Sequence, residues 1–301
     1  MNGFPIYIPS KGRYECITAK QLLNFKIPFK IVIEPQDYND YEKKWGDYLL
    51  VLDKNDMGIS YVRQVIINYA KSNGQNWIWM IDDDITEWWD RVSNDGCVKA
   101  NISFLNKVEN HILNHAEKDK VGQVGLYHSV WACKKNCIIP FISENVGIVQ
   151  VVAFNLSNIN IEYDPQLNGM EDQDLTLRLL KSGVKTLRYN HFSFKTYSKG
   201  ENKGGLYYFY KNNPISNTVK RFYNSVGGVK NISDLPFEDF DIDVNGSENY
   251  NENVFNIEYI EGYINKRIIF YKIGNRADDF IEMRRHMGIP LASKSFDIVC
   301  F

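Results

Sequence analysis

The segment at 77–84, WIWMIDDD, joins an uninterrupted apolar run to three consecutive aspartates. Four apolar residues in a row, from Ile78 to Ile81, are typical of a strand that is buried on both faces of a sheet. Ligand sites of open α/β sheets lie at the carboxyl ends of such strands. We therefore expect a central strand that places the aspartates in a site at the edge of the sheet.

The first two thirds of the chain alternate strand-like and helix-like patterns, which predicts an α/β fold with a mainly parallel sheet flanked by helices. Short runs of β-branched and aromatic residues predict strands at 5–9, 29–34, 48–52, 77–81, 124–127, 149–155 and 186–189. A helix is expected at 60–72, with Ser60 as its N-cap, Gly74 beyond its end and Arg63 among its outward residues. A second helix is expected to begin near Glu171 and to stop at Gly183.

Length and composition are those of a globular protein. The 301 residues, 44% of them hydrophobic, suffice for one large α/β domain with or without an appendage. The pattern changes after Tyr210, so we expect a catalytic domain at 1–210 and a helical C-terminal extension at 211–301 packed on it.

Several protein classes are disfavoured by the composition. No apolar run reaches the roughly 18–20 residues of a membrane span, and the N-terminus lacks a secretory signal pattern, which predicts a cytoplasmic protein with no membrane partner. The five cysteines form no even framework and no CxxC pair, so they are expected to be reduced thiols. The net charge of −2 gives no global sign of nucleic-acid binding.

The three aspartates favour metal and phosphate chemistry. Adjacent carboxylates repel one another unless they are solvated or bridged by a cation. In an extended chain Asp82 and Asp84 would face one side and Asp83 the other, which is the arrangement of a DxD metal site. Hard oxygen ligands favour Mg²⁺ or Mn²⁺, which usually share their coordination with substrate phosphates. A polar turn without a ligand, or the two-metal site of a phosphatase or nuclease, would fit the same string.

A second acidic motif, GMEDQD, lies at 169–174. Transfer to a hydroxyl requires a carboxylate within reach of the acceptor proton, and we assign that role to Asp172, with Glu171 positioning the acceptor or the base. Acids that favour the dipole at a helix N-terminus would give the same pattern.

Three further segments supply candidate ligands. His191 follows the last predicted strand and could complete a metal shell begun by Asp84, or be an ordinary structural histidine. In KGENKGG at 199–205, Lys203 adds charge while Gly204 and Gly205 allow close backbone approach to a diphosphate, although a surface turn would look the same.

Near the N-terminus, IPSKGR places Pro9, Ser10 and Arg13 where a nucleotide would meet the sheet edge. Arg63, on the helix before the aspartate strand, is a candidate partner for the nucleotide, or for the carboxylates in a salt bridge.

Taken together, the motifs IYIPSKGR, IVIEPQDYNDYEKKW, GISYVRQVIINYA, WMIDDDI and GMEDQDLTLRLL, followed by His191, resemble the TET-associated glycosyltransferase family over residues 4–210. Members of that family resemble GT-A enzymes, with a Rossmann-like fold, and many are encoded by phages. The resemblance implies a nucleotide-sugar donor such as a UDP-sugar, a Mn²⁺ or Mg²⁺ ion at the DxD, and 5-hydroxymethylated pyrimidine in DNA as the acceptor.

The resemblance also assigns individual roles. It carries the DxD positions onto Asp82 and Asp84, the late metal ligand onto His191, and the base of an inverting transfer onto Asp172. Glu34 in the second motif and Asp83 join the residues expected near the nucleotide sugar. If the chain is phage encoded, it would act in the host cytoplasm.

The acceptor is the least determined part of this hypothesis. DNA binding draws on Lys and Arg contacts to phosphates, and a basic stretch at 195–230 is the local candidate for them. A base extruded from the duplex could stack on Trp88 or Trp89, although tryptophans in such positions are more often packing residues.

Alternative functions are a glycosyltransferase acting on a glycan, protein or small molecule, a nucleotidyltransferase, and a catalytically idle module that binds nucleotide or DNA. A retaining mechanism is also open. The early loop IPSKGR has one glycine, which disfavours the glycine-rich phosphate loop of a nucleotidyltransferase.

Overall fold

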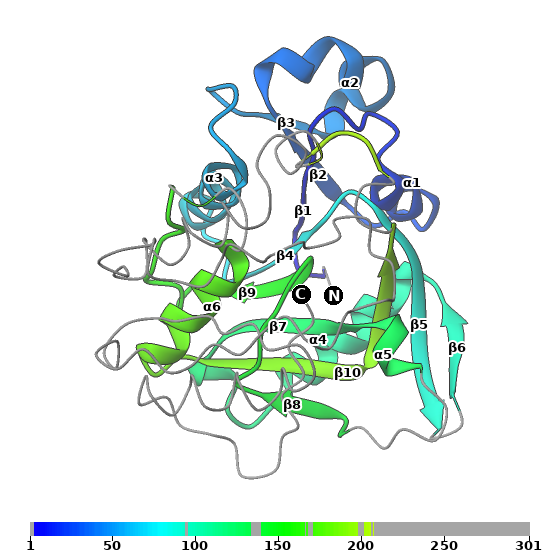
Figure 1. The fold of residues 1–301 in the computed structure, drawn as a ribbon, viewed down its shortest axis with the longest axis vertical. Coiled ribbons are helices and arrows are strands. Elements are labelled where there is room, and N and C mark those ends of the chain that lie inside the picture. Colours follow the sequence, from blue (N-terminus) through cyan, green and yellow to red (C-terminus); the bar gives the residue numbers. More distant parts are fainter. Residues whose placement is uncertain are drawn as a thin grey trace, which may run out of the picture.

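A computed structural model describes residues 3–93, 96–133, 140–165, 167, 171–197, 202–205 and 207. Ten strands form one sheet in the order β3-β2-β1-β4-β9-β7-β10-β5-β6, with β8 paired to β10 (Figure 1). The strands are β1 (Ile6–Pro9), β2 (Phe29–Ile33), β3 (Leu49–Val51), β4 (Trp77–Ile81), β5 (Ile85–Ser93), β6 (Gly96–Ala100), β7 (Val121–His128), β8 (Ile142–Glu144), β9 (Val151–Asn155) and β10 (Lys185–Thr196).

The α/β class is confirmed, with a sheet that combines both strand directions. β1 pairs in parallel with β2 and β4, β2 with β3, and β7 with β10. β9 runs antiparallel between β4 and β7, and β5 runs antiparallel to both β10 and β6. The strands β1 to β4 therefore end at one edge, and there they deliver Ser10, Glu34 and Asp82.

Helices cover both faces of the sheet, as the apolar β4 sequence requires. On one face, α1 (Ile17–Asn24), α2 (Tyr38–Trp45) and α4 (Leu105–Leu113) pack with Trp79 and Ile81. On the other, α3 (Ile59–Ser72) and α6 (Glu171–Lys181) pack with Ile78 and Met80. In Figure 1, α3 and α6 lie on one side of the view and α1 on the other, while the short α5 (Ser129–Ala132) follows β7.

Three strands, β5, β6 and β8, are missing from the sequence prediction. β5 carries Thr86, Glu87 and Asp90 on partly exposed positions, so its composition does not show the apolar run of a buried strand. Pairing with β10 on one side and β6 on the other nevertheless makes it an internal strand of the sheet.

The helix predictions hold with two corrections. α3 begins at Ile59, and its N-cap is Gly58 instead of Ser60, whose hydroxyl donates to the carbonyl oxygen of Leu167. Arg63 is not an outward residue, because only 5% of it is exposed and it points into the site described below. α6 begins at Glu171 as predicted.

The expectation of reduced thiols is wrong for two cysteines. Cys97 in β6 and Cys133 after α5 form a disulfide, although 36 residues separate them in sequence. Their Cα atoms lie 5.2 Å apart, because β5 packs against both β6 and α5, a proximity that spacing does not reveal. Cys16 is free and buried.

Within the part of the chain that the structure describes, no helix is long and apolar enough to cross a membrane. The predicted extension at 211–301 lies outside the described residues, as do most of the basic positions of the 195–230 stretch. The domain boundary near Tyr210 therefore stays a prediction.

Packing around β7 yields a test of this arrangement. A Cβ added to Gly125 would overlap the side chain of Ile148, so Gly125→Ala should lower the free energy of unfolding by about 1–3 kcal/mol. In an Ile148→Ala background the same substitution should cost less, and chemical denaturation of the four proteins measures both effects. An equal cost in both backgrounds would contradict this packing.

Candidate active site at the sheet edge

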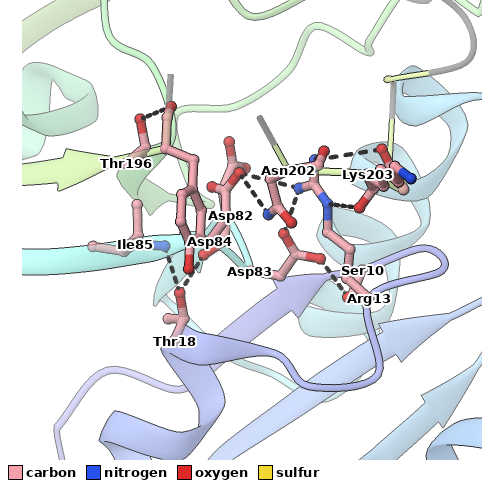
Figure 2. Close-up of polar contacts among 12 residues, drawn as sticks. Ser10, Arg13, Thr18, Asp82, Asp83, Asp84, Ile85, Thr196, Asn202 and Lys203 are labelled. Carbon is pink, nitrogen blue, oxygen red and sulfur yellow. Dashed lines mark hydrogen bonds and ion pairs between the residues drawn. The ribbon is translucent and has the colours of Figure 1, made fainter. Parts of the chain in front are cut away.

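The three aspartates form the turn between β4 and β5, and α1 fixes that turn. The hydroxyl of Thr18 donates to the carbonyl oxygen of Asp82 at 2.7 Å and accepts from the amide of Ile85 at 3.1 Å. The amide of Thr18 donates to the carbonyl oxygen of Asp83, and the amide of Asp82 donates to that of Gln150. The backbone of the aspartate turn is thus fixed by hydrogen bonds on both sides (Figure 2).

Arg13 forms ion pairs with two of the aspartates. Its Nη1 lies 2.8 Å from Asp83 Oδ1 and 3.1 Å from Asp84 Oδ2. The Ser10 hydroxyl adds a hydrogen bond to Asp83 Oδ2. The expectation that Asp83 faces away from Asp84 is therefore wrong, because the two lie in a turn and not in an extended strand, and both reach the same guanidinium.

Arg13 also holds the segment 202–205 against the aspartates. Its Nε donates to the carbonyl oxygen of Lys203 at 3.1 Å, and its Nη2 donates to that of Asn202 at 3.1 Å. The amide of Gly205 donates to the carbonyl oxygen of Lys11 at 2.7 Å. A Cβ on Gly204 would lie 2.8 Å from that same Lys11 oxygen, and Gly204 has a φ of +94°, so glycine permits this contact.

The IPSKGR loop and residues 202–205, the described part of the second segment predicted to bind the nucleotide, thus meet at the aspartates. The close backbone approach expected of Gly204 and Gly205 is made to the N-terminal loop. The Lys203 side chain is exposed.

On the opposite side of the turn, Arg63 bridges the two acidic motifs. Its Nη2 lies 3.2 Å from Asp82 Oδ1, and its Nε lies 3.3 Å from Glu171 Oε1. Arg63 and Glu171 are both buried, so this is an internal ion-pair network that joins α3, the end of β4 and the start of α6. The salt-bridge alternative for Arg63 is the one that the structure contains.

The carboxylates in this network have strongly shifted pKa values. Burial raises the pKa of Asp82 to about 7, with Arg63 opposing the shift and Asp84 and Asp83 adding to it. Burial likewise raises the pKa of Asp83 to about 6 against the opposing effect of Arg13. Burial and Asp172 raise the pKa of Glu171, which Arg63 partly offsets. The shared cause is removal from water of several like charges.

The remaining predicted ligands at the N-terminal half lie at the same edge. Pro9 is the buried last residue of β1. Glu34 follows β2, where Lys11 Nζ lies 2.8 Å from its Oε2 and the Gln36 side-chain amide donates to it at 2.6 Å. Glu34 therefore contacts the loop at 10–13 through Lys11.

His191 is not placed to complete a shell begun by Asp84. Thr196 of β10 lies opposite Ile85, the residue after the aspartates, and His191 lies five residues further back, about 16 Å along the strand at the usual rise. Its ring instead contacts Phe141 with centroids 4.9 Å apart. The sequence predicts a strand that ends at residue 189, before His191, whereas β10 continues to Thr196.

Of the two alternatives for Trp88, stacking and packing, packing is the one that the structure contains. Trp88 is buried, packs on Phe104 and donates its indole N–H to Gln21, so it belongs to the core. Trp89 is half-buried and donates to Glu87.

Sequence reasoning missed Thr18 and Tyr41. The Tyr41 hydroxyl lies 2.7 Å from Ser10 Oγ and accepts from the amide of Arg13 at 2.8 Å, so it shapes the N-terminal loop. Both residues lie on helices in positions where packing is the usual interpretation, and only the fold brings them to the aspartates.

Comparison with known proteins identifies the family. Residues 4–205, more than half of the chain, match the model of the TET-associated glycosyltransferases. The chain belongs to the TET-associated glycosyltransferase family. As a member of this family, the chain is a glycosyltransferase. A glycosyltransferase of this family implies a nucleotide-sugar donor and an acceptor.

Other comparisons add less. A solved structure with similarity to this family member is the mannose-1-phosphate geranyltransferase from Thermus thermophilus, with 9% sequence identity and a TM-score of 0.37. The match covers 64% of this chain and 75% of that chain, and at this TM-score it carries no argument. No curated protein matches the chain.

The donor atoms at the turn fit a hard divalent cation. Asp82 and Asp84 present carboxylate oxygens at the sheet edge, and Mg²⁺ and Mn²⁺ are commonly held by one or two carboxylates together with substrate phosphates. Among the described residues no group of three or more His, Cys, Asp or Glu side chains is arranged to hold a metal. A cation at this turn would therefore depend on oxygens from the donor.

The Asp83 carboxyl yields a pH-dependent prediction. Its pKa is about 6 in the folded chain against an ordinary value of 3.8, so its contribution to stability is full below pH 3.8 and is lost as the pH rises through 6. The Asp83 carboxyl should therefore lower the free energy of unfolding of the unchanged chain as the pH rises from 4 to 6. In Asp83→Asn this fall should be smaller, by on the order of 2 kcal/mol.

Denaturant titrations of both chains across this range measure the difference. Asp90→Asn, which removes a carboxylate paired with Lys107 outside the site, is the control for the loss of one charge. Parallel pH profiles for Asp83→Asn and the unchanged chain would contradict the raised pKa.

Proposed function

We propose that this chain transfers a sugar from a UDP-sugar to the hydroxymethyl group of a modified pyrimidine in DNA, with Mn²⁺ or Mg²⁺ at Asp82 and Asp84. The observation that carries the proposal is the arrangement at the sheet edge. Three aspartates, the IPSKGR loop and the 202–205 segment meet on one side of Arg63, and the acids that begin α6 lie on the other.

The side containing Arg13 suits the donor. Ser10, Arg13 and the Lys11–Glu34 pair line the ends of β1 and β2, where open α/β sheets bind nucleotides. Lys203 is exposed beside Arg13, where its charge would attract a diphosphate. A bound divalent cation would neutralise the diphosphate as it leaves, and Asp84 with Asp82 would hold that cation.

The side containing α6 suits the acceptor. Asp172 is only half-buried, so its carboxylate is accessible to an incoming hydroxyl, whereas Glu171 is buried against Arg63. In the proposed reaction the acceptor oxygen forms a bond to the anomeric carbon, the bond from that carbon to the diphosphate breaks, and Asp172 takes the acceptor proton. Attack opposite the leaving group would invert the anomeric configuration.

The choice of acceptor rests on the family name and on local charge. Lys195 and Lys203 are exposed near the site and are described members of the basic 195–230 stretch, which would contact DNA phosphates. The alternatives are a glycan, protein or small-molecule acceptor, or a module that binds without transfer. A module that binds without transfer is disfavoured, because a buried network of charges costs stability and binding alone does not require it.

The cation assignment can be tested at Asp84. Asp84→Ala should remove the gain in UDP affinity that Mn²⁺ provides, a loss of about 10–100-fold, because a charged ligand to the cation is gone. The variant also removes one of the two carboxylates that pair with Arg13, so that more of its charge is available to a phosphate and some metal-independent affinity should remain.

Calorimetric titration with UDP, in the presence and absence of Mn²⁺, measures the gain in UDP affinity that the cation provides. Asp90→Ala is the matched control outside the site. Should Asp84→Ala retain the Mn²⁺-dependent gain in full, the cation does not bind at this turn.

The base assignment can be tested at Asp172. Asp172→Asn should leave the Kd for UDP within about twofold and lower the rate of sugar transfer by about 10²–10⁴-fold, the usual contribution of a general base. Mass spectrometry of nucleosides from hydroxymethylated DNA incubated with UDP-sugars measures the transfer, again with Asp90→Asn alongside. Undiminished transfer would assign the base role to another residue.

A further inference from the structure

Two buried polar atoms beside the acids of α6 have no hydrogen-bond partner among the residues that the structure describes. They are Nε of Arg63 and the hydroxyl of Tyr163, and the two residues are only 5% and 4% exposed. Buried polar groups are almost always paired with protein or water, and an exception calls for an explanation such as a catalytic role or a bound water, ion or substrate group.

Both atoms are hydrogen-bond donors close to carboxylates. Arg63 Nε lies 3.3 Å from Glu171 Oε1 but does not meet the geometry of a hydrogen bond. Tyr163 interacts electrostatically with Arg63, Glu171 and Asp172, and burial, the largest cause, raises the pKa of its phenol, so the hydroxyl keeps its proton. Arg63 offsets part of that shift through its charge and through a side-chain contact with the hydroxyl, but this contact does not meet the geometry of a hydrogen bond.

The position of Tyr163 is fixed by its backbone. Its amide donates to the side-chain oxygen of Gln64 in α3 at 2.8 Å, and the carbonyl of the preceding Glu162 accepts from Arg178 of α6 at 2.7 Å. The ring packs in the core beneath α3 and α6. The ring is therefore held in place, and its hydroxyl interacts electrostatically with Arg63, Glu171 and Asp172.

Tyr189 provides a comparison, because its hydroxyl is buried away from the acids of α6. The hydroxyl of Tyr189 is also buried and without a partner among the described residues, but its ring lies among Phe141, Phe192 and His111. Burial is the only cause of its raised pKa, and no carboxylate contributes. Of these two tyrosines, Tyr163 alone combines an unpartnered hydroxyl with the acidic pair.

We propose that Tyr163 is an acceptor-binding residue, whose hydroxyl donates a hydrogen bond to the reacting alcohol oxygen while Asp172 accepts the proton of that alcohol. This inference rests on the proposed transferase function and adds the recognition of its acceptor. A site that hydrogen-bonds a hydroxyl through a buried donor rejects the analogue that lacks it, because the donor is then left unpaired. Tyr163 thus favours a hydroxymethyl group over a methyl group.

The test compares Tyr163→Phe with Tyr189→Phe, two changes that each remove one buried, unpartnered hydroxyl. Neither should lower the thermal stability, because each deletes a polar group that is unsatisfied in the free protein. The first readout is binding: the Kd for an oligonucleotide with 5-hydroxymethylcytosine is measured against the same oligonucleotide with 5-methylcytosine. The preference of the unchanged chain should fall by about 3–10-fold in Tyr163→Phe and persist in Tyr189→Phe.

The second readout is transfer. Tyr163→Phe should raise KM for the hydroxymethylated oligonucleotide and lower kcat, with the Kd for UDP unchanged, and a structural role alone would not produce that split. If the unchanged chain transfers sugar and both variants keep its hydroxymethyl preference, this inference is overturned and the transferase proposal stands. If the unchanged chain neither transfers sugar nor prefers hydroxymethylated DNA, the proposed acceptor and this inference are overturned together.

Discussion

Pairing of buried carboxylates with two arginines is the interaction on which the site depends. Three aspartates at the end of a strand buried on both faces would repel one another and lose much of their hydration. Arg13 contacts Asp83 and Asp84 from the N-terminal loop, and Arg63 contacts Asp82 from α3. Removing either guanidinium would leave a buried charge without compensation, which is among the costliest single changes in a protein interior.

These two arginines also explain why segments distant in sequence meet at one edge. Arg13 joins the loop after β1 to the turn after β4 and to the carbonyl groups at 202–204. Arg63 joins α3 and the same turn to Glu171 at the start of α6. The donor side and the acceptor side of the proposed site are therefore separate clusters that share the aspartate turn. A change in the charge of this turn would therefore alter the electrostatic interactions of both clusters, because each contacts the turn through its arginine.

The sequence predicts those features that depend on local pattern. The apolar run before Asp82 predicts β4, and the periodicity before Gly74 and after Glu171 predicts α3 and α6. The order of the motifs indicates the family, which the match over residues 4–205 confirms.

Features that depend on tertiary contact could not be predicted. Arg63 resembles an outward helix residue because a cation inside a core is rare, and its ion pairs with Asp82 and Glu171 make its burial tolerable. His191 lies near the aspartates only if the last strand is short, and β10 is twelve residues long. The pairing of Cys97 with Cys133 likewise depends on how β6 and α5 flank β5.

Charge balance at the edge connects the structure to the proposed chemistry. Among the described residues there, carboxylates outnumber guanidiniums, because Asp82, Asp83 and Asp84, with Glu171 and Asp172 behind them, face two arginines. The raised pKa values of Asp82 and Asp83 follow from burial and from this excess of negative charge. A divalent cation would remove the excess and favour the ionised carboxylates, and so would stabilise the turn in the state that binds a diphosphate. The same repulsion that makes the free site costly at neutral pH would thus contribute to the free energy of binding the proposed cation.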